Sequence, residues 1–122
     1  MVGGATTTVL SNDSDERSIR PASSEEKAFA EKIINATRDR DYEAFIENGD
    51  RGFKTITKSE FDAVCTQMEK KFKDGHDLIY LGDLKTRGYQ TTLWRVSFEN
   101  GSDDSVGRMS VKNGKVVYFL LQ

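Results

Sequence analysis

The chain has 122 residues, enough for one domain with one hydrophobic core. Its 18 Lys and Arg against 20 Asp and Glu give a net charge of -2, so no overall basic field attracts nucleic acid or an anionic membrane. A single cysteine, Cys65, and a single histidine, His76, make neither an internal disulfide nor a histidine-based metal site. No apolar run approaches the roughly 20 residues that span a bilayer. We therefore expect no cofactor, no metal, no nucleic-acid partner and no membrane partner.

Residues 1–22 are rich in Ser, Asp, Gly and Thr and hold the one proline, Pro21. This composition predicts a flexible leader before a single domain over residues 23–122. A short edge strand at residues 6–10, Thr-Thr-Thr-Val-Leu, is an alternative for part of it. The first residues lack the basic start and apolar stretch of a secretory signal. Two locations stay open, the cytoplasm or a mature exported chain without its leader.

Helical spacing of apolar residues predicts three helices, the first long, the second short and the third long. Ser23 and Glu26 form the pattern of a capping box at the start of the first, as do Thr57 and Glu60 at the start of the third. Asp41 is placed to cap the second helix. The third helix has an apolar stripe that includes Cys65, which we therefore expect to be a small buried hydrophobe: Phe61, Val64, Cys65, Met68 and Phe72.

From Asp77 onward the apolar pattern alternates, which predicts four strands at residues 77–84, 89–98, 105–111 and 115–122. Asn-Gly pairs at residues 100–101 and 113–114 are typical of tight hairpins, although residues 99–104 are also long enough for a wider loop. Helices followed by strands predict an α+β fold. Its three helices pack on one face of a curved four-stranded antiparallel meander.

Both faces of the last strand are apolar. A two-residue turn at residues 113–114 predicts that Met109 faces Tyr118 on one side of the final hairpin. The other side then carries the candidate interface residues Arg108, Val117, Phe119 and Leu121. One face must pack on the helices, and the other either pairs with a partner or tolerates exposed apolar groups.

The motifs "DYEAF" at 41–45, "TKSEF" at 57–61 and "NGKVVYF" at 113–119 follow an entry helix in the order helix, helix, sheet. This arrangement resembles the cystatin-like, nuclear-transport-factor-2-like superfamily, in particular its small uncharacterised bacterial members, over roughly residues 24–122. The resemblance implies a sheet curved as a cone, often with a pocket at its wide end, and frequent homodimers through the sheet. The superfamily holds ketosteroid-isomerase-like enzymes as well as binding modules. The enzymes' Asp or His base and its oxyanion donor have no match here, so no catalytic residue is assigned.

We therefore expect a non-enzymatic binding or assembly module that homodimerises through the outer face of its sheet, with a further protein partner as another option. The alternative is a carrier of a small apolar ligand, or a ketosteroid-isomerase-like enzyme, with a pocket between helices and sheet. The candidate lining of that pocket is Trp94, Tyr80, Tyr42 and Arg108.

Four of the polar or aromatic residues have a simpler interpretation beside the functional one. Trp94 alternates correctly for a core position, which is favoured over a ligand platform. Arg95 and Arg108 fall on neighbouring strands and either share an anion or, as we favour, bond to Glu99 or Asp104. His76 sits at a helix-to-strand junction, where local hydrogen bonding is favoured over catalysis.

Overall fold

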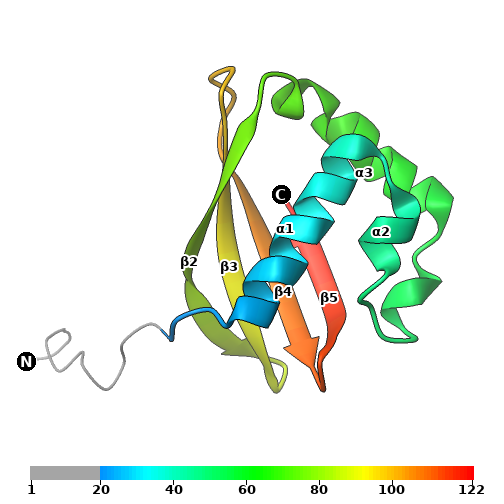
Figure 1. Cartoon of the computed structure of the whole chain (residues 1–122), viewed down its shortest axis with the longest axis vertical. Helices are drawn as coiled ribbons and strands as arrows, with labels where there is room; N and C mark the ends of the chain where they lie inside the picture. The colour runs from blue at the N-terminus through cyan, green and yellow to red at the C-terminus, as the bar shows by residue number, and fades with distance from the viewer. Residues whose placement is uncertain (1–19) are drawn as a thin grey trace, which may run out of the picture.

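A computed structural model describes residues 20–122. Within them three α-helices come first along the chain and four β-strands follow (Figure 1). The predicted α+β fold, with a long, a short and a long helix before an antiparallel four-stranded meander, is therefore confirmed. The possible strand at residues 6–10 and the rest of the leader up to residue 19 lie outside the described residues. The elements are α1 (Ser24–Asp39), α2 (Tyr42–Ile46), a 3₁₀ turn η2 (Phe53–Thr55), α3 (Lys58–Phe72), β2 (His76–Thr86), β3 (Tyr89–Phe98), β4 (Ser105–Lys112) and β5 (Lys115–Leu121).

Each helix begins at the cap that the sequence predicts. The Ser23 hydroxyl accepts a hydrogen bond from the Glu26 backbone N–H at 3.0 Å, and the Glu26 carboxylate accepts one from the Ser23 N–H at 2.9 Å. Thr57 and Glu60 form the same reciprocal pair at the start of α3. Asp41 accepts from a backbone N–H of α2. These contacts satisfy N–H groups that have no partner inside the helix.

The strands form one antiparallel sheet in the order β2-β3-β4-β5. Two-residue turns join β2 to β3 at Arg87-Gly88 and β4 to β5 at Asn113-Gly114, and all four residues have positive φ. This geometry matches the twist of a hairpin. The turn at Asn113 is the predicted one, whereas an arginine at the first turn position is unusual and the sequence offers little sign of it. Between β3 and β4, residues 99–104 form the wider loop and not a tight two-residue turn at Asn100-Gly101.

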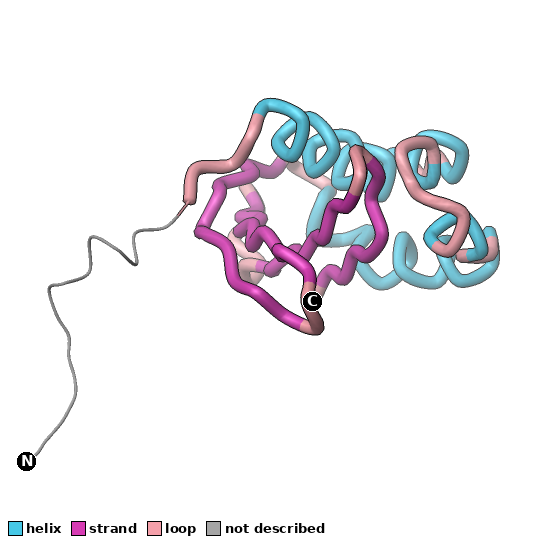
Figure 2. The backbone as a smooth tube through the Cα atoms, turned by 90° about the horizontal axis from the view of Figure 1, so that it is seen from below, coloured by secondary structure: helices cyan, strands magenta, loops and turns pink. Residues whose placement is uncertain are grey.

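The helices cover one face of the curved sheet, which we term the inner face, and leave the outer face uncovered by any described element (Figure 2). Trp94, Val96 and Phe98 alternate along β3 and point inward, where each is at most 7% exposed. They meet Ile33 and Ile34 of α1 and the aromatic side chains of the other helices. The prediction of Trp94 as a core residue is confirmed.

The structure contains a β-bulge in β5 that the sequence did not predict. Ser110 pairs with Tyr118 and Met109 pairs with Phe119, so Val117 is an extra residue on β5. Because side chains alternate along a strand, one extra residue exchanges the faces of every residue that follows. The predicted pairing of Met109 with Tyr118 is therefore wrong by one position.

The bulge also corrects two of the interface candidates. Phe119 and Leu121, which we expected on the outer face, pack against the core instead. Gly107 makes room for this arrangement, because a Cβ at that position would lie 3.3 Å from the Phe119 ring. Tyr118 and Leu120 take the outer positions and are 44% and 39% exposed.

Residues 20–22, which their composition places in the leader, are attached to the domain. The Arg20 guanidinium donates to Glu26 at 3.0 Å and to Asp83 at 3.4 Å. The Tyr80 hydroxyl donates to the Arg20 carbonyl oxygen, and Ala22 packs against the core. Residues 20–22 therefore pack as part of the domain.

Candidate functional site

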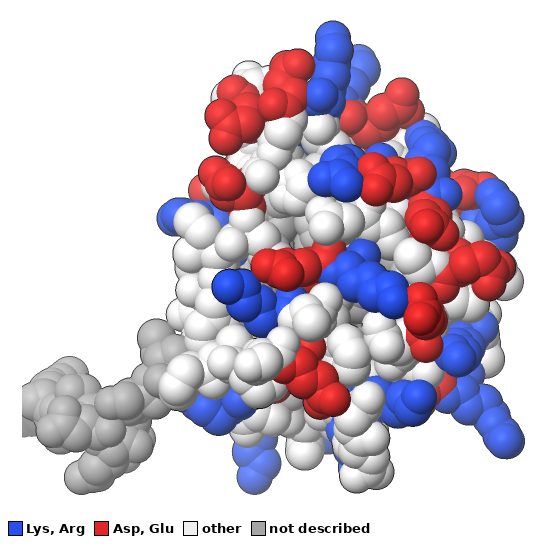
Figure 3. Space-filling model, viewed as in Figure 1, with Lys and Arg blue, Asp and Glu red and all other residues white. Residues whose placement is uncertain are grey.

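The helical side of the molecule carries acidic and basic side chains interspersed (Figure 3). Arg20, Arg38 and Arg40 all form ion pairs with neighbouring carboxylates. Charges that are neutralised in this way produce no strong field of one sign. This side therefore shows no sign of a site for a charged ligand.

Exposed apolar side chains gather on the outer face of the sheet. Four of the six exposed large hydrophobic residues among residues 20–122 occupy positions of this face, and their exposed fractions lie between 36% and 44%. Ile79 comes from edge strand β2, Tyr89 from β3, and Tyr118 and Leu120 from the opposite edge strand β5. Apolar groups concentrated on one face are typical of an interaction surface. We name these four the outer apolar set: Ile79, Tyr89, Tyr118 and Leu120.

Two arginines lie on the same outer face without carboxylate partners. The strand register places Arg95 of β3 and Arg108 of β4 diagonally across neighbouring strands. Neither forms an ion pair or a side-chain hydrogen bond with any residue between 20 and 122, so the favoured interpretation that they bond to Glu99 or Asp104 is wrong. The Arg95 Nε atom is buried and has no hydrogen-bond partner there. A buried donor without a partner loses its hydration without compensation, which is unusual in a folded protein.

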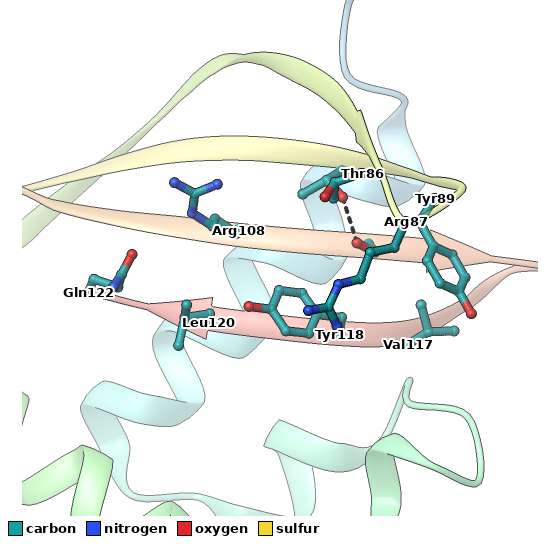
Figure 4. A pocket seen from close by; sticks show the side chains of 10 residues that line it. Thr86, Arg87, Tyr89, Arg108, Val117, Tyr118, Leu120 and Gln122 are labelled. Carbon is teal, nitrogen blue, oxygen red and sulfur yellow. Dashed lines mark hydrogen bonds between the residues drawn. The ribbon is translucent and has the colours of Figure 1, made fainter.

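A hollow of about 520 Å³ runs along the outer face from the β2–β3 turn to Gln122 (Figure 4). Arg87 approaches from the β2–β3 turn, and Arg108, Tyr118 and Leu120 come from β4 and β5. The lining combines guanidinium groups, hydroxyl groups and apolar surface, and it includes no Asp or Glu side chain. We name it the outer-face hollow, and its lining is Thr86, Arg87, Tyr89, Thr91, Arg108, Ser110, Val117, Tyr118, Leu120 and Gln122.

Two buried hydroxyl groups belong to the lining of this hollow. Thr91 Oγ1 and Ser110 Oγ are 2.8 Å apart on paired positions of β3 and β4, and the residues are 1% and 2% exposed. The dashed line in Figure 4 marks this contact. Only one of the two hydroxyl hydrogens is used between them. The other has no acceptor within the described part of the chain, so it is available to a ligand.

A second hollow, of about 300 Å³, lies between α1 and β2, and we name it the edge cleft. Glu31 and Asn35 of α1 face His76 and Asp77 of β2 across it. Burial, and then the charge of Arg38, lower the pKa of His76 below its usual value of 6.5. The lining of the edge cleft contains no hydroxyl, thiol or amine nucleophile, so His76 has no partner there for nucleophilic catalysis.

The four predicted pocket residues do not line a common pocket. The Trp94 indole N–H donates to the buried Thr92 hydroxyl at 2.8 Å, and the Tyr80 ring packs 5.1 Å from the Trp94 ring. The Tyr42 hydroxyl donates to the Ile56 carbonyl oxygen on the helical side. These three side chains fill space between the helices and the sheet and line neither hollow. Of the four, Arg108 alone lines a hollow, and that hollow lies on the opposite face of the sheet.

The remaining sequence candidates show no reactive site. Cys65 is 2% exposed, and burial raises the pKa of its thiol, so it is the buried hydrophobe that its place in the third helix predicts. Residues 20–122 contain no group of three or more His, Cys, Asp or Glu side chains that could hold a metal ion. None of the helices in that range is long and apolar enough to cross a membrane.

Comparisons with known proteins bear on the fold. No protein-family model matches this sequence, and no curated protein matches it. Among solved structures, the chain is similar to an uncharacterised cystatin-fold protein from Novosphingobium aromaticivorans, with 10% identity and a TM-score of 0.43. The match covers 78% of this chain and 95% of that protein.

Proposed function

We propose that this chain is a non-enzymatic binding module that pairs with a second copy of itself through the outer face of its sheet. The observation that carries the proposal is the outer apolar set, four large side chains that the helices do not cover. Ile79 and Tyr118, which lie on opposite edge strands, mark the width of the surface. Burial of such side chains in a partner would add to stability in the same way as burial in a core.

The dimensions of the sheet are adequate for a stable interface. Four strands about 4.8 Å apart, each about eight residues long at roughly 3.3 Å per residue, project an area of about 500 Å². The accessible area of a face with protruding side chains is larger than its projection. A standard interface buries about 800 Å² per partner. The area of one whole outer face is therefore of the order that one partner of a dimer buries.

The charges at the two ends of the sheet favour a second copy as the occupant. The turns at residues 86–89 and 112–115 carry Arg87, Lys112 and Lys115 and no acidic residue. The loop at the opposite end, residues 99–104, carries Glu99, Asp103 and Asp104 and no basic residue. A two-fold axis in the interface, perpendicular to the strands, places the basic end of each copy beside the acidic end of the other.

The test is sedimentation of the wild-type chain and three variants at tens of micromolar protein. We expect a dimer for the wild type and a shift toward monomer for Ile79→Glu and for Tyr118→Glu, since each places a charge within the proposed apolar contact. Val64→Glu is the matched control, because Val64 is 37% exposed on the helical side of the molecule and should not touch the second copy. The dimer should also weaken as salt is added, because its end-to-end charge pairs are exposed.

Two results would contradict the proposal. One is a strictly monomeric wild-type chain at these concentrations. The other is an unchanged dimer mass for both outer-face variants when circular dichroism shows that they are folded. A dimer lost in the Val64→Glu variant alone would place the interface on the helical side instead.

A further inference from the structure

We propose that the outer-face hollow binds a small amphipathic carboxylate, with the carboxylate group attracted by the guanidinium groups of Arg87 and Arg108 that line it and the apolar body against Tyr118 and Leu120. Every residue that lines the hollow belongs to one chain, so the site is complete in a single copy. Tyr89, Tyr118 and Leu120 also belong to the outer apolar set, so a second copy on this face would compete with the ligand. The hollow lies on the face of the sheet away from the helices. It is therefore separate from the region between helices and sheet where the sequence placed a pocket.

The charge of the hollow selects an anion. Arg87 and Arg108 line it, and neither forms an ion pair or a side-chain hydrogen bond within residues 20–122. Arg95, on the neighbouring strand of the same face, adds a third positive charge and carries the buried Nε without a partner. Planar guanidinium groups match the two oxygens of a carboxylate in geometry as well as charge. A carboxylate would therefore supply the counter-charge that no described residue provides.

A buried donor strengthens the selection of an anion. The pair formed by Thr91 and Ser110 has one hydroxyl hydrogen without an acceptor among the described residues, and the hollow is the open space beside it. A ligand oxygen at this position would accept that hydrogen. The site thus offers guanidinium donors at its rim and a hydroxyl donor at its floor, and these are the groups that an anion binds.

The size and the remaining walls select the body of the ligand. A volume of about 520 Å³ is in the usual range of pockets for small organic molecules and exceeds what a bare inorganic ion would fill. Val117, Tyr118 and Leu120 give one wall an apolar surface, and the Tyr89 ring faces the hollow near the turn. The bulge at Val117 contributes directly, because it brings Tyr118 and Leu120 to the outer face. An acyl or aryl chain attached to the carboxylate would cover this wall.

The inference is tested by titrating the protein with octanoate, 1-octanol and inorganic phosphate, with the Kd measured from amide chemical shifts in NMR spectra at low salt. We expect saturable octanoate binding, with the largest shifts at residues 91, 110 and 118. Octanol, which has the same chain length without the charge, and phosphate, which has the charge without the chain, should each bind at least about tenfold more weakly, because each loses one half of the contacts.

Three arginine variants identify the anion site. Arg108→Gln and Arg87→Gln should each weaken octanoate binding about tenfold, which is the effect of losing one charge-assisted hydrogen bond. Arg51→Gln is the matched control, since Arg51 is exposed, forms no ion pair within the described residues and does not line the hollow. Thermal unfolding of each variant shows whether a change in Kd comes from binding or from loss of the fold.

The titration is repeated on Ile79→Glu, a residue outside the lining, so that a second copy covering the hollow cannot hide the site. Absence of saturable octanoate binding in both the wild type and this variant would overturn the inference. Equal affinities for octanoate and octanol, or for octanoate and phosphate, would overturn it as well. A result of this kind leaves the sedimentation result for the dimer unchanged, so the two proposals fail separately.

Discussion

The neighbouring residues Phe119 and Tyr118 face opposite sides of the sheet, which gives a direct test of the bulge in β5. Phe119→Ala removes a ring that packs edge-on to Phe45 at 6.3 Å and lies over Gly107. Removal of a fully buried phenylalanine ring destabilises a protein by about 3 to 5 kcal/mol. Since Phe119 is half-buried, we expect about 2 to 3 kcal/mol. Tyr118→Ala removes a ring that is 44% exposed, and we expect less than about 1 kcal/mol.

Urea unfolding measures both values, at protein concentrations low enough that dimerisation adds nothing to the free energy of unfolding. The loss of about 2 to 3 kcal/mol expected for Phe119→Ala corresponds to a melting temperature roughly 10 °C below that of the wild type, at about 4 °C for each kcal/mol in a domain of this size. A two-residue turn without a bulge would turn Tyr118 inward and Phe119 outward, and the order of the two effects would then be reversed. Equal losses in the two variants, or a larger loss for Tyr118→Ala, would refute the register described above.

Three further variants test the caps and the titrating groups. Thr57→Ala should destabilise the fold by about 1 kcal/mol through loss of the α3 cap, as urea unfolding would show. Burial raises the pKa of Glu26, but hydrogen bonds from Arg20 and from the helix start outweigh it and hold that pKa below 4.5. Glu26→Gln should therefore destabilise the fold by about 1 kcal/mol at neutral pH, with the difference from wild type lost as the pH falls through the lowered pKa. The pKa of His76 is lowered in the folded protein, so the imidazole of the unfolded chain binds a proton first as the pH falls. The stability of the wild type should therefore decrease below about pH 6.5. Thermal unfolding measured as a function of pH should show a smaller decrease for His76→Gln.

The elements of this fold were predictable because their signals are local. A capping box is complete within four residues, so Ser23 with Glu26 and Thr57 with Glu60 identified two helix starts without any tertiary information. The alternation around Trp94 likewise identified the inner face of β3. The attachment of Arg20 was not predictable in this way, because its partner Asp83 is 63 residues away along the chain.

The candidate site depended on contacts between residues that are far apart along the chain. A bulge has no reliable sequence signature, and the one at Val117 arises where Phe119 can pack over Gly107. It placed Tyr118 and Leu120 on the outer face in place of two predicted residues. The arginine at position 87 also went unrecognised, since an Arg-Gly turn lacks the Asn or Asp that identifies most hairpins of this type.

The sequence by itself determined the order of helices and strands, the helix caps, the buried stripe of each helix and the final hairpin turn. Each of these is set by the spacing of residues within a short segment, so it does not depend on contacts with the rest of the fold. Only the tertiary structure decided which side of β5 meets the core, since that depends on how well Phe119 fits against residues from other elements. The same packing left Arg87 and Arg108 in the lining of one hollow on the far face, with no Asp or Glu side chain in that lining. That the two arginines line the same hollow depends on strand pairing and curvature, which spacing along the chain does not specify.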